Sequence, residues 1–146
     1  MFCGDAMRRR RDAELDKMII GTGIDIVEVF RMRDAINKWG DNFLTKVFTG
    51  KEIKYSSSKR FAPQHFAARF AAKEAVVKAF GVARRYPLNW TDIEIFNDSE
   101  GKPVISFSND ALKLKNKKKV NDVVVSMSHS KNYAVANVIL LRKRKR

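Results

Sequence analysis

The stretch from His65 to Gly81, reading HFAARFAAKEAVVKAFG, restricts the possible folds more than any other part of the chain. Phe66, Phe70, Val77 and Phe80 recur at helical spacing, and alanine fills most of the positions between them. This pattern predicts one long, largely buried helix, and a glycine at position 81 is a typical residue to end it. A long central helix is therefore the first element of the expected fold.

Four charged residues interrupt this apolar helix, namely Arg69, Lys73, Glu74 and Lys78. Glu74 follows Phe70 by four residues and precedes Lys78 by four, so these three side chains lie along one ridge. A carboxylate at the edge of a packing face needs a partner, because an unpaired buried charge is costly. Lys78 or a metal ion could be that partner, while a plain surface ion pair would contribute only about 0.3–0.5 kcal/mol.

A second carboxylate stands in an unusual place, inside an apolar strand. Residues 18–29 read MIIGTGIDIVEV, and the β-branched residues predict a strand, in which aspartate is uncommon. Gly21 and Gly23 indicate a bulge, or a close approach by a ligand or another backbone. Asp25 either caps the helix that follows or is a metal-binding or general-base carboxylate held on a rigid strand.

A third polar group follows a buried strand near the end of the chain. Residues 122–132 read DVVVSMSHSKN, and residues 133–141 predict a strand that returns antiparallel to the first. The tip between them holds His129, one of two histidines in the chain, followed by Ser130 and Lys131. A lone histidine is commonly structural. Hydroxyl, imidazole and ammonium groups all donate hydrogen bonds, however, so the tip also suits a phosphate.

The remaining segments complete an α+β pattern without an internal repeat. Thr49 and Glu52 have the spacing of a capping box, which predicts a short helix over residues 49–55. A helix is expected over about residues 33–39, followed by a polar connection, and residues 92–97 and 102–108 predict two strands joined by a turn. We therefore expect an antiparallel sheet packed on the long helix.

Four ordered blocks, GTGID, FAARFAAKEAVVKAFG, NDSEGKP and SMSHS, closely resemble the holo-[acyl-carrier-protein] synthases, the small type of 4′-phosphopantetheinyl transferase. The resemblance spans about residues 18–141 and implies the 4′-phosphopantetheinyl transferase-like fold over that range. Residues 1–17 would then be a flexible N-terminal extension, and residues 142–146 a basic C-terminal tail. The implied reaction transfers the phosphopantetheine arm of coenzyme A to a serine of acyl carrier protein and releases adenosine 3′,5′-bisphosphate, in support of fatty acid biosynthesis.

The resemblance also implies roles for the unusual acidic residues. Asp25 and Glu74 would be catalytic and would hold Mg²⁺, which proteins typically bind through one or two carboxylates plus waters and phosphates. Lys78 would contact a coenzyme A phosphate, help to activate the serine or neutralise the leaving group. Three candidates remain for the base that deprotonates the serine: a metal-bound water, a carboxylate beside the metal, and Glu28.

Further positions are implied at the coenzyme A site. The two basic residues before Glu74 would bind the 3′-phosphate or the pyrophosphate, and the SMSHS block would lie near the nucleotide. The NDSEGKP turn would border the adenine, although its glycine and proline also suit an ordinary hairpin turn. The cofactor-binding residues implied in this way are Arg69, Lys73, Lys78, Gly101, Pro103, His129 and Ser130.

The net charge of +14 suggests an acidic partner, because complementary charge raises association rates and selects partners. Acyl carrier protein is acidic, and the resemblance implies that Arg31 contacts it. The alternative function is a basic nucleic-acid-binding protein, which the pI of about 10.2 favours but which leaves Asp25 and Glu74 unexplained. A family member that has lost activity and only binds the carrier protein is a second alternative.

Composition bears on the size and the location of the protein. A chain of 146 residues, 45% of them hydrophobic, suits a single domain with a core, and no apolar run has the ~20 residues of a membrane span. The single cysteine fits a reducing compartment, so we expect the cytoplasm, or an organelle such as a plastid. Larger transferases of the superfamily contain two such halves, whereas this chain has only one. A single half would leave one wall of the coenzyme A site open, so the resemblance implies a homotrimer with sites at subunit boundaries.

Overall fold

The computed structural model describes residues 6–9, 16–82 and 87–145. β1, β5 and β4 form one antiparallel sheet in that order, and β2 and β3 form a separate antiparallel hairpin. The α+β class expected from the sequence is confirmed. The elements in chain order are β1 (Lys17–Glu28), α2 (Val29–Trp39), α3 (Asp41–Val47), α4 (Gly50–Ser57), α5 (Ala62–Phe80), the 3₁₀ helix η1 (Trp90–Asp92), β2 (Ile93–Asn97), β3 (Pro103–Phe107), α6 (Asn109–Lys117), β4 (Asp122–His129) and β5 (Tyr133–Lys143).

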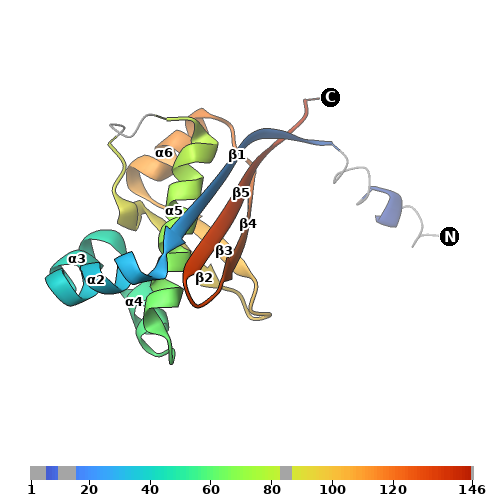
Figure 1. Cartoon of the computed structure of the whole chain (residues 1–146). Coiled ribbons are helices and arrows are strands. Elements are labelled where there is room, and N and C mark those ends of the chain that lie inside the picture. Colours follow the sequence, from blue (N-terminus) through green and yellow to red (C-terminus); the bar gives the residue numbers. More distant parts are fainter. Residues whose placement is uncertain (1–5, 10–15, 83–86, 146) are drawn as a thin grey trace.

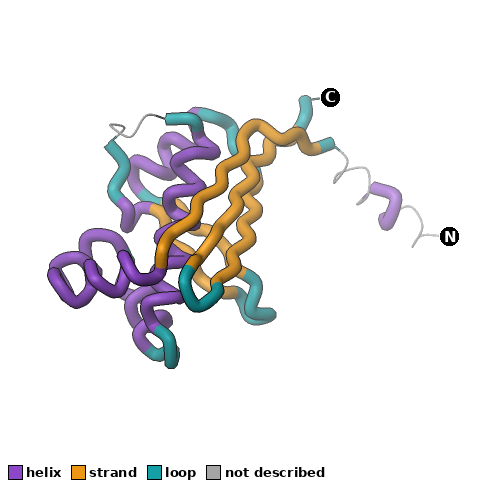
Figure 2. Tube along the Cα trace, in the orientation of Figure 1, coloured by secondary structure: helices purple, strands orange, loops and turns teal. Residues whose placement is uncertain are grey.

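Helix α5 is the central element, as its alanine-rich pattern predicts. It lies against one face of the three-stranded sheet, with α2, α3 and α4 at one end of that sheet and α6 at the other (Figure 1 and Figure 2). The helix ends at Gly81, whose φ of 67° is in the left-handed region that glycine tolerates best. The core is therefore built around one helix whose small side chains allow strands to approach closely.

Strand β1 makes the closest of these approaches. A methyl group placed on Gly23 would overlap the carbonyl oxygen of Ala75, and one on Gly21 would overlap that of Ala79. The strand has a register irregularity between Ile19 and Gly21. The sequence left open whether Gly21 and Gly23 mark a bulge or a close approach. The structure shows both, and the approaching backbone belongs to α5.

The two faces of β1 have different surroundings, because successive side chains of a strand point in opposite directions. Gly23, Asp25 and Val27 point toward α5. Ile24 and Ile26 point away from it, and they are 61% and 64% exposed although both are large and apolar. An apolar face of this kind, on a strand at the edge of its sheet that pairs with β5, is available for contact with another molecule.

Several sequence-based boundaries need correction. The polar connection expected after Trp39 is helix α3, and residues 109–117, to which no element was assigned from the sequence, form helix α6. Strand β5 continues through Lys143, which pairs with Lys17, so the basic tail is shorter than residues 142–146. The flexible extension expected over residues 1–17 falls largely outside the described residues. Within them, no helix combines the length and the apolar character needed to cross a bilayer.

Candidate active site

Asp25, Glu74 and Lys78 line one open pocket of about 500 Å³. The pocket lies where the end of β1 and the start of α2 meet the middle of α5, and Val27, Phe70 and Val77 form part of its apolar wall. The strand alternation directs Asp25 inward, and the four-residue spacing on α5 places Glu74 and Lys78 one turn apart. The structure thus brings together two carboxylates and an ammonium group from segments that are far apart in the sequence.

Lys78 makes two contacts across the strand–helix junction. Its ammonium donates to Asp25 Oδ1 at 2.9 Å and to the carbonyl oxygen of Ile24 at 3.0 Å. The Asp25 side chain is only 18% exposed, whereas that of Lys78 is 54% exposed. Lys78 therefore remains accessible to a ligand in the pocket while it compensates the charge of the half-buried Asp25.

The donor set of the pocket fits Mg²⁺. Asp25 is inward-facing and Glu74 is half-buried, and both reach the same hollow. Within residues 6–9, 16–82 and 87–145 no three His, Cys, Asp or Glu side chains gather closely enough to enclose a metal. One or two carboxylates, completed by waters and substrate phosphates, is the usual protein contribution to a Mg²⁺ site, so the residues present are sufficient.

Arg31 and Glu28 lie at the mouth of the same pocket. Glu28 Oε2 is 3.7 Å from Arg31 Nε, and the Arg31 side chain is largely exposed. Such an exposed pair contributes little to stability. Arg31 is therefore placed where it can meet a macromolecule that approaches the pocket, as the sequence-based prediction requires.

A second polar cluster lies outside this pocket and contains Arg69 and His129. The Arg69 guanidinium is 4.0 Å from the centre of the Tyr55 ring, and one of its terminal nitrogens is 3.5 Å from Asn97 Oδ1. His129 packs edge-to-face on His65, with ring centroids 5.0 Å apart. We call the five residues Tyr55, His65, Arg69, Asn97 and His129 the histidine cluster.

His65 and Tyr55 were not predicted as site residues. Two signals in the sequence could have identified His65: it precedes Arg69 by one helical turn, and it is one of only two histidines. Tyr55 carries no comparable signal, because its contact with Arg69 depends on how α4 packs against α5.

The other predicted nucleotide-site residues also lie outside the first pocket. Gly101 occupies the β2–β3 turn with φ of 80°, as expected for a glycine there, and Pro103 starts β3 opposite Asn97 of the histidine cluster. Ser130 follows His129, and its Oγ accepts a 3.3 Å hydrogen bond from the Tyr133 N–H that helps to close the hairpin. These residues therefore belong to the same side of the molecule as the histidine cluster.

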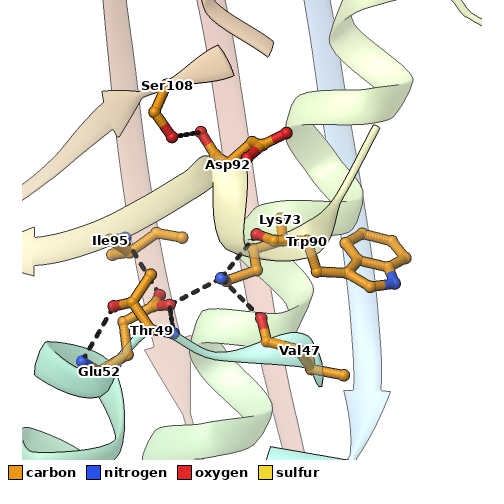
Figure 3. A network of polar contacts seen from close by, with 8 residues as sticks. All are labelled: Val47, Thr49, Glu52, Lys73, Trp90, Asp92, Ile95 and Ser108. Atoms are coloured by element: carbon orange, nitrogen blue, oxygen red, sulfur yellow. Dashed lines mark hydrogen bonds and ion pairs between the residues drawn. The ribbon is translucent and has the colours of Figure 1, made fainter. Parts of the chain in front are cut away.

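The sequence-based prediction that Lys73 binds a coenzyme A phosphate needs correction. Its side chain is 0% exposed, and its ammonium donates to Glu52 Oε1 at 2.7 Å and to the carbonyl oxygens of Val47 at 2.8 Å and Trp90 at 2.9 Å (Figure 3). Burial lowers the pKa of Lys73, and Glu52 opposes this by favouring the charged ammonium. With all three of its protons donated inside the protein, Lys73 has none left for a phosphate and joins α5 to its neighbours instead.

Comparisons with known proteins point to one family. Residues 21–138 match the 4′-phosphopantetheinyl transferase superfamily. The holo-[acyl-carrier-protein] synthase of Koribacter versatilis is 45% identical over 123 residues, which are 84% of this chain and 98% of that protein. The corresponding protein of Syntrophus aciditrophicus is 42% identical over 123 residues, which are 84% of this chain and 96% of that protein.

Solved structures agree with the sequence comparisons. The holo-[acyl-carrier-protein] synthase of Neisseria meningitidis superimposes with a TM-score of 0.77 at 31% identity, covering 84% of this chain and 98% of that chain. A holo-(acyl-carrier-protein) synthase of Bacillus anthracis, in complex with CoA (3′,5′-ADP), gives a TM-score of 0.71 at 34% identity, covering 86% of this chain and 99% of that chain.

Proposed function

The chain belongs to the 4′-phosphopantetheinyl transferase superfamily, among its holo-[acyl-carrier-protein] synthases, and we propose that Asp25, Glu74 and Lys78 carry its reaction. The enzyme transfers the 4′-phosphopantetheine arm of coenzyme A to a serine of apo acyl carrier protein. Membership of this family favours the transferase function over the alternative of nucleic-acid binding. We further propose that the enzyme serves fatty acid biosynthesis in the cytoplasm.

The reaction makes one P–O bond and breaks another. The serine hydroxyl oxygen attacks the phosphorus that carries the pantetheine arm, the bridging P–O bond of the pyrophosphate breaks, and adenosine 3′,5′-bisphosphate leaves. The serine loses its proton to a base, and Glu28, which lines the pocket beside Asp25, is the carboxylate available there besides the two proposed metal ligands. The protein contributes mainly positioning and a favourable electric field.

Asp25 and Glu74 are proposed to hold Mg²⁺, and a bound Mg²⁺ would neutralise charge on the pyrophosphate oxygens. Lys78 contacts Asp25 in the free protein and is exposed on its other side. It is proposed to donate to a pyrophosphate oxygen and so to stabilise the charge that develops on the leaving group. Arg31, at the mouth of the pocket, is proposed to contact the acidic surface of the carrier protein.

A homotrimer is proposed from the separation of the two groups of site residues. Arg69 and Glu74 are five residues apart on α5, so their side chains leave the helix in directions about 140° apart. The histidine cluster therefore does not line the pocket of its own chain. The exposed apolar face of β1, with Ile24 and Ile26, offers a contact through which a neighbouring copy would bring its histidine cluster to this pocket.

The observation that carries the proposal is the convergence of Asp25, Glu74 and Lys78 on one pocket. The test mixes the purified protein with coenzyme A, Mg²⁺ and apo acyl carrier protein, and detects the added arm by mass spectrometry. Removal of Mg²⁺ with a chelator is expected to stop transfer, and added Mg²⁺ to restore it. Absence of transfer with every divalent metal would reject the enzymatic function, whereas full activity of Asp25→Ala or Glu74→Ala would reject only the metal ligands.

A further inference from the structure

The histidine cluster brings both histidines of the chain into contact. His65 lies in the second turn of α5 and His129 is the last residue of β4. Their rings meet edge-to-face at 5.0 Å, and His65 also packs edge-to-face on Tyr55 at 6.0 Å. His65 is half-buried and His129 is exposed, so the pair lies at the surface, and the His65 ring packs on Tyr55.

The groups that face this pair are nearly all basic or neutral. Arg69 lies one turn after His65 on α5, and Asn97 ends β2. Lys59 follows α4, and its ammonium lies 4.6 Å from the centre of the Tyr55 ring. Glu52 is a carboxylate that acts on Arg69, and it accepts a hydrogen bond from the buried Lys73. Arg69 is 2% exposed, and its Nε has no hydrogen-bond partner. The cluster thus has an excess of positive charge and a buried donor that is not satisfied, which together suit an anion.

We infer that His65 and His129 act as one proton-linked contact for the 3′-phosphate of coenzyme A, taking up a proton from solvent when that phosphate binds. This inference rests on the proposed function and adds His65 and the proton to the site. Without an anion, Arg69 and Lys59 disfavour a charged imidazole, and burial together with His129, Arg69 and Lys59 lowers the pKa of His65. A bound dianion reverses this balance, because it favours the imidazolium and accepts its hydrogen bonds.

The chemistry of coenzyme A selects the 3′-phosphate over the pyrophosphate. The pyrophosphate belongs at the pocket of Asp25, Glu74 and Lys78, which lies on another side of α5. The 3′-phosphate is a terminal monoester, which carries close to two negative charges at neutral pH because its second pKa is about 6. When a basic site binds such a group, the phosphate itself can only release protons. Net proton uptake must therefore come from the protein, and histidine is the side chain that ordinarily titrates in this range.

The direct test is isothermal titration calorimetry of the full-length protein at pH 7.5, with coenzyme A and with dephospho-coenzyme A, which lacks only the 3′-phosphate. Repeating each titration in buffers with different protonation enthalpies gives the number of protons exchanged. We expect uptake of roughly 0.5–1 proton with coenzyme A and about none with dephospho-coenzyme A. Affinity for coenzyme A should then rise by up to about tenfold between pH 8 and pH 7, while affinity for dephospho-coenzyme A stays constant.

His65→Gln should lower the proton uptake and weaken coenzyme A binding by roughly three- to tenfold, with no change for dephospho-coenzyme A. Lys113→Gln, at an exposed position of α6 where the ammonium is 3.7 Å from Asp110 Oδ1, is the control for loss of one basic group elsewhere. NMR titration of the two imidazoles in the unmodified protein gives the same answer without a variant: their pKa values should rise when adenosine 3′,5′-bisphosphate is added.

Equal proton uptake with both ligands, or unchanged imidazole pKa values, would overturn the inference and leave the proposed function intact. A protein that binds neither ligand would overturn both.

Discussion

The buried ion pair between Glu52 and Lys73 leads to a prediction that distinguishes this structural lysine from Lys78, the proposed catalytic lysine on the same helix. In Lys73→Met the apolar stem remains but the ammonium is lost. Glu52 then keeps only the backbone N–H groups of Thr49 at 2.9 Å and Ile95 at 3.1 Å as donors. Val47 and Trp90 each lose the donor to their carbonyl oxygens. The substitution therefore leaves a buried charge without its counter-charge.

The expected cost follows from these losses. Breaking a buried pair by removing one partner typically costs about 3–5 kcal/mol, because the remaining charge stays buried. This is a large part of the roughly 5–15 kcal/mol by which a domain is stable. Lys73→Met should therefore lower the free energy of unfolding by about 3–5 kcal/mol. Urea unfolding followed by tryptophan fluorescence and circular dichroism measures this quantity.

A double-mutant cycle identifies the pair as the cause. Glu52→Gln removes the second charge, so the combined variant should be less destabilised than the sum of the two single variants by about 1–3 kcal/mol. Lys78→Met is the matched control, because it makes the same change five residues further along α5 at an exposed site. It should cost less than about 1 kcal/mol of stability but lose most of the transferase activity.

Two results would refute this reasoning. A cost below about 1 kcal/mol for Lys73→Met would show that the pair is not an important structural contact. Folded Lys73→Met protein with strongly reduced affinity for coenzyme A, and little loss of stability, would restore the phosphate-binding role that the sequence suggested.

Three further predictions test other parts of the structure. Gly23→Ala should lower the free energy of unfolding by at least about 1–3 kcal/mol, measured by urea unfolding, because the added methyl group forces β1 away from α5; Gly50→Ala, which meets nothing within 4 Å, should be near neutral. Ile26→Glu should convert the proposed trimer to smaller species in size-exclusion chromatography with light scattering, whereas Leu112→Glu, at an exposed apolar residue on α6, should not. Because the folded-state pKa of His65 lies below its usual 6.5, the unfolded chain binds more protons between these values. The contribution of neutral His65 to stability should therefore be fully present above pH 6.5 and be lost as the pH drops through the folded-state pKa. His65→Gln should flatten this decline, which thermal unfolding across that pH range measures.

The resemblance to the family led to the prediction that Asp25, Glu74 and Lys78 share one site, and local rules explain part of their arrangement. The alternation of β1 fixes the inward direction of Asp25, and the four-residue spacing on α5 aligns Glu74 with Lys78. The glycines at 21 and 23 correctly indicated a close backbone approach. The capping box at Thr49 and Glu52 was also predicted and is present, with both of its hydrogen bonds.

Residues whose environment depends on tertiary packing could not be predicted in the same way. Lys73 resembles its neighbour Lys78 in sequence, and only the packing of α4 and η1 over α5 buries it. Helix α6 was not recognised because lysines outnumber its buried residues Ala111 and Leu114. Helix α3 is only seven residues long, too short for a periodic pattern to stand out.

Strand β1 gives the enzyme a property that can be measured in dilute solution. Neighbouring positions of this strand have different surroundings, since the Asp25 side chain lines the pocket while those of Ile24 and Ile26 face outward. If neighbouring copies complete each other's sites through that outer face, specific activity per chain should be constant at high enzyme concentration. It should then fall steeply once dilution separates the subunits, and preincubation with coenzyme A should move that fall to lower concentration.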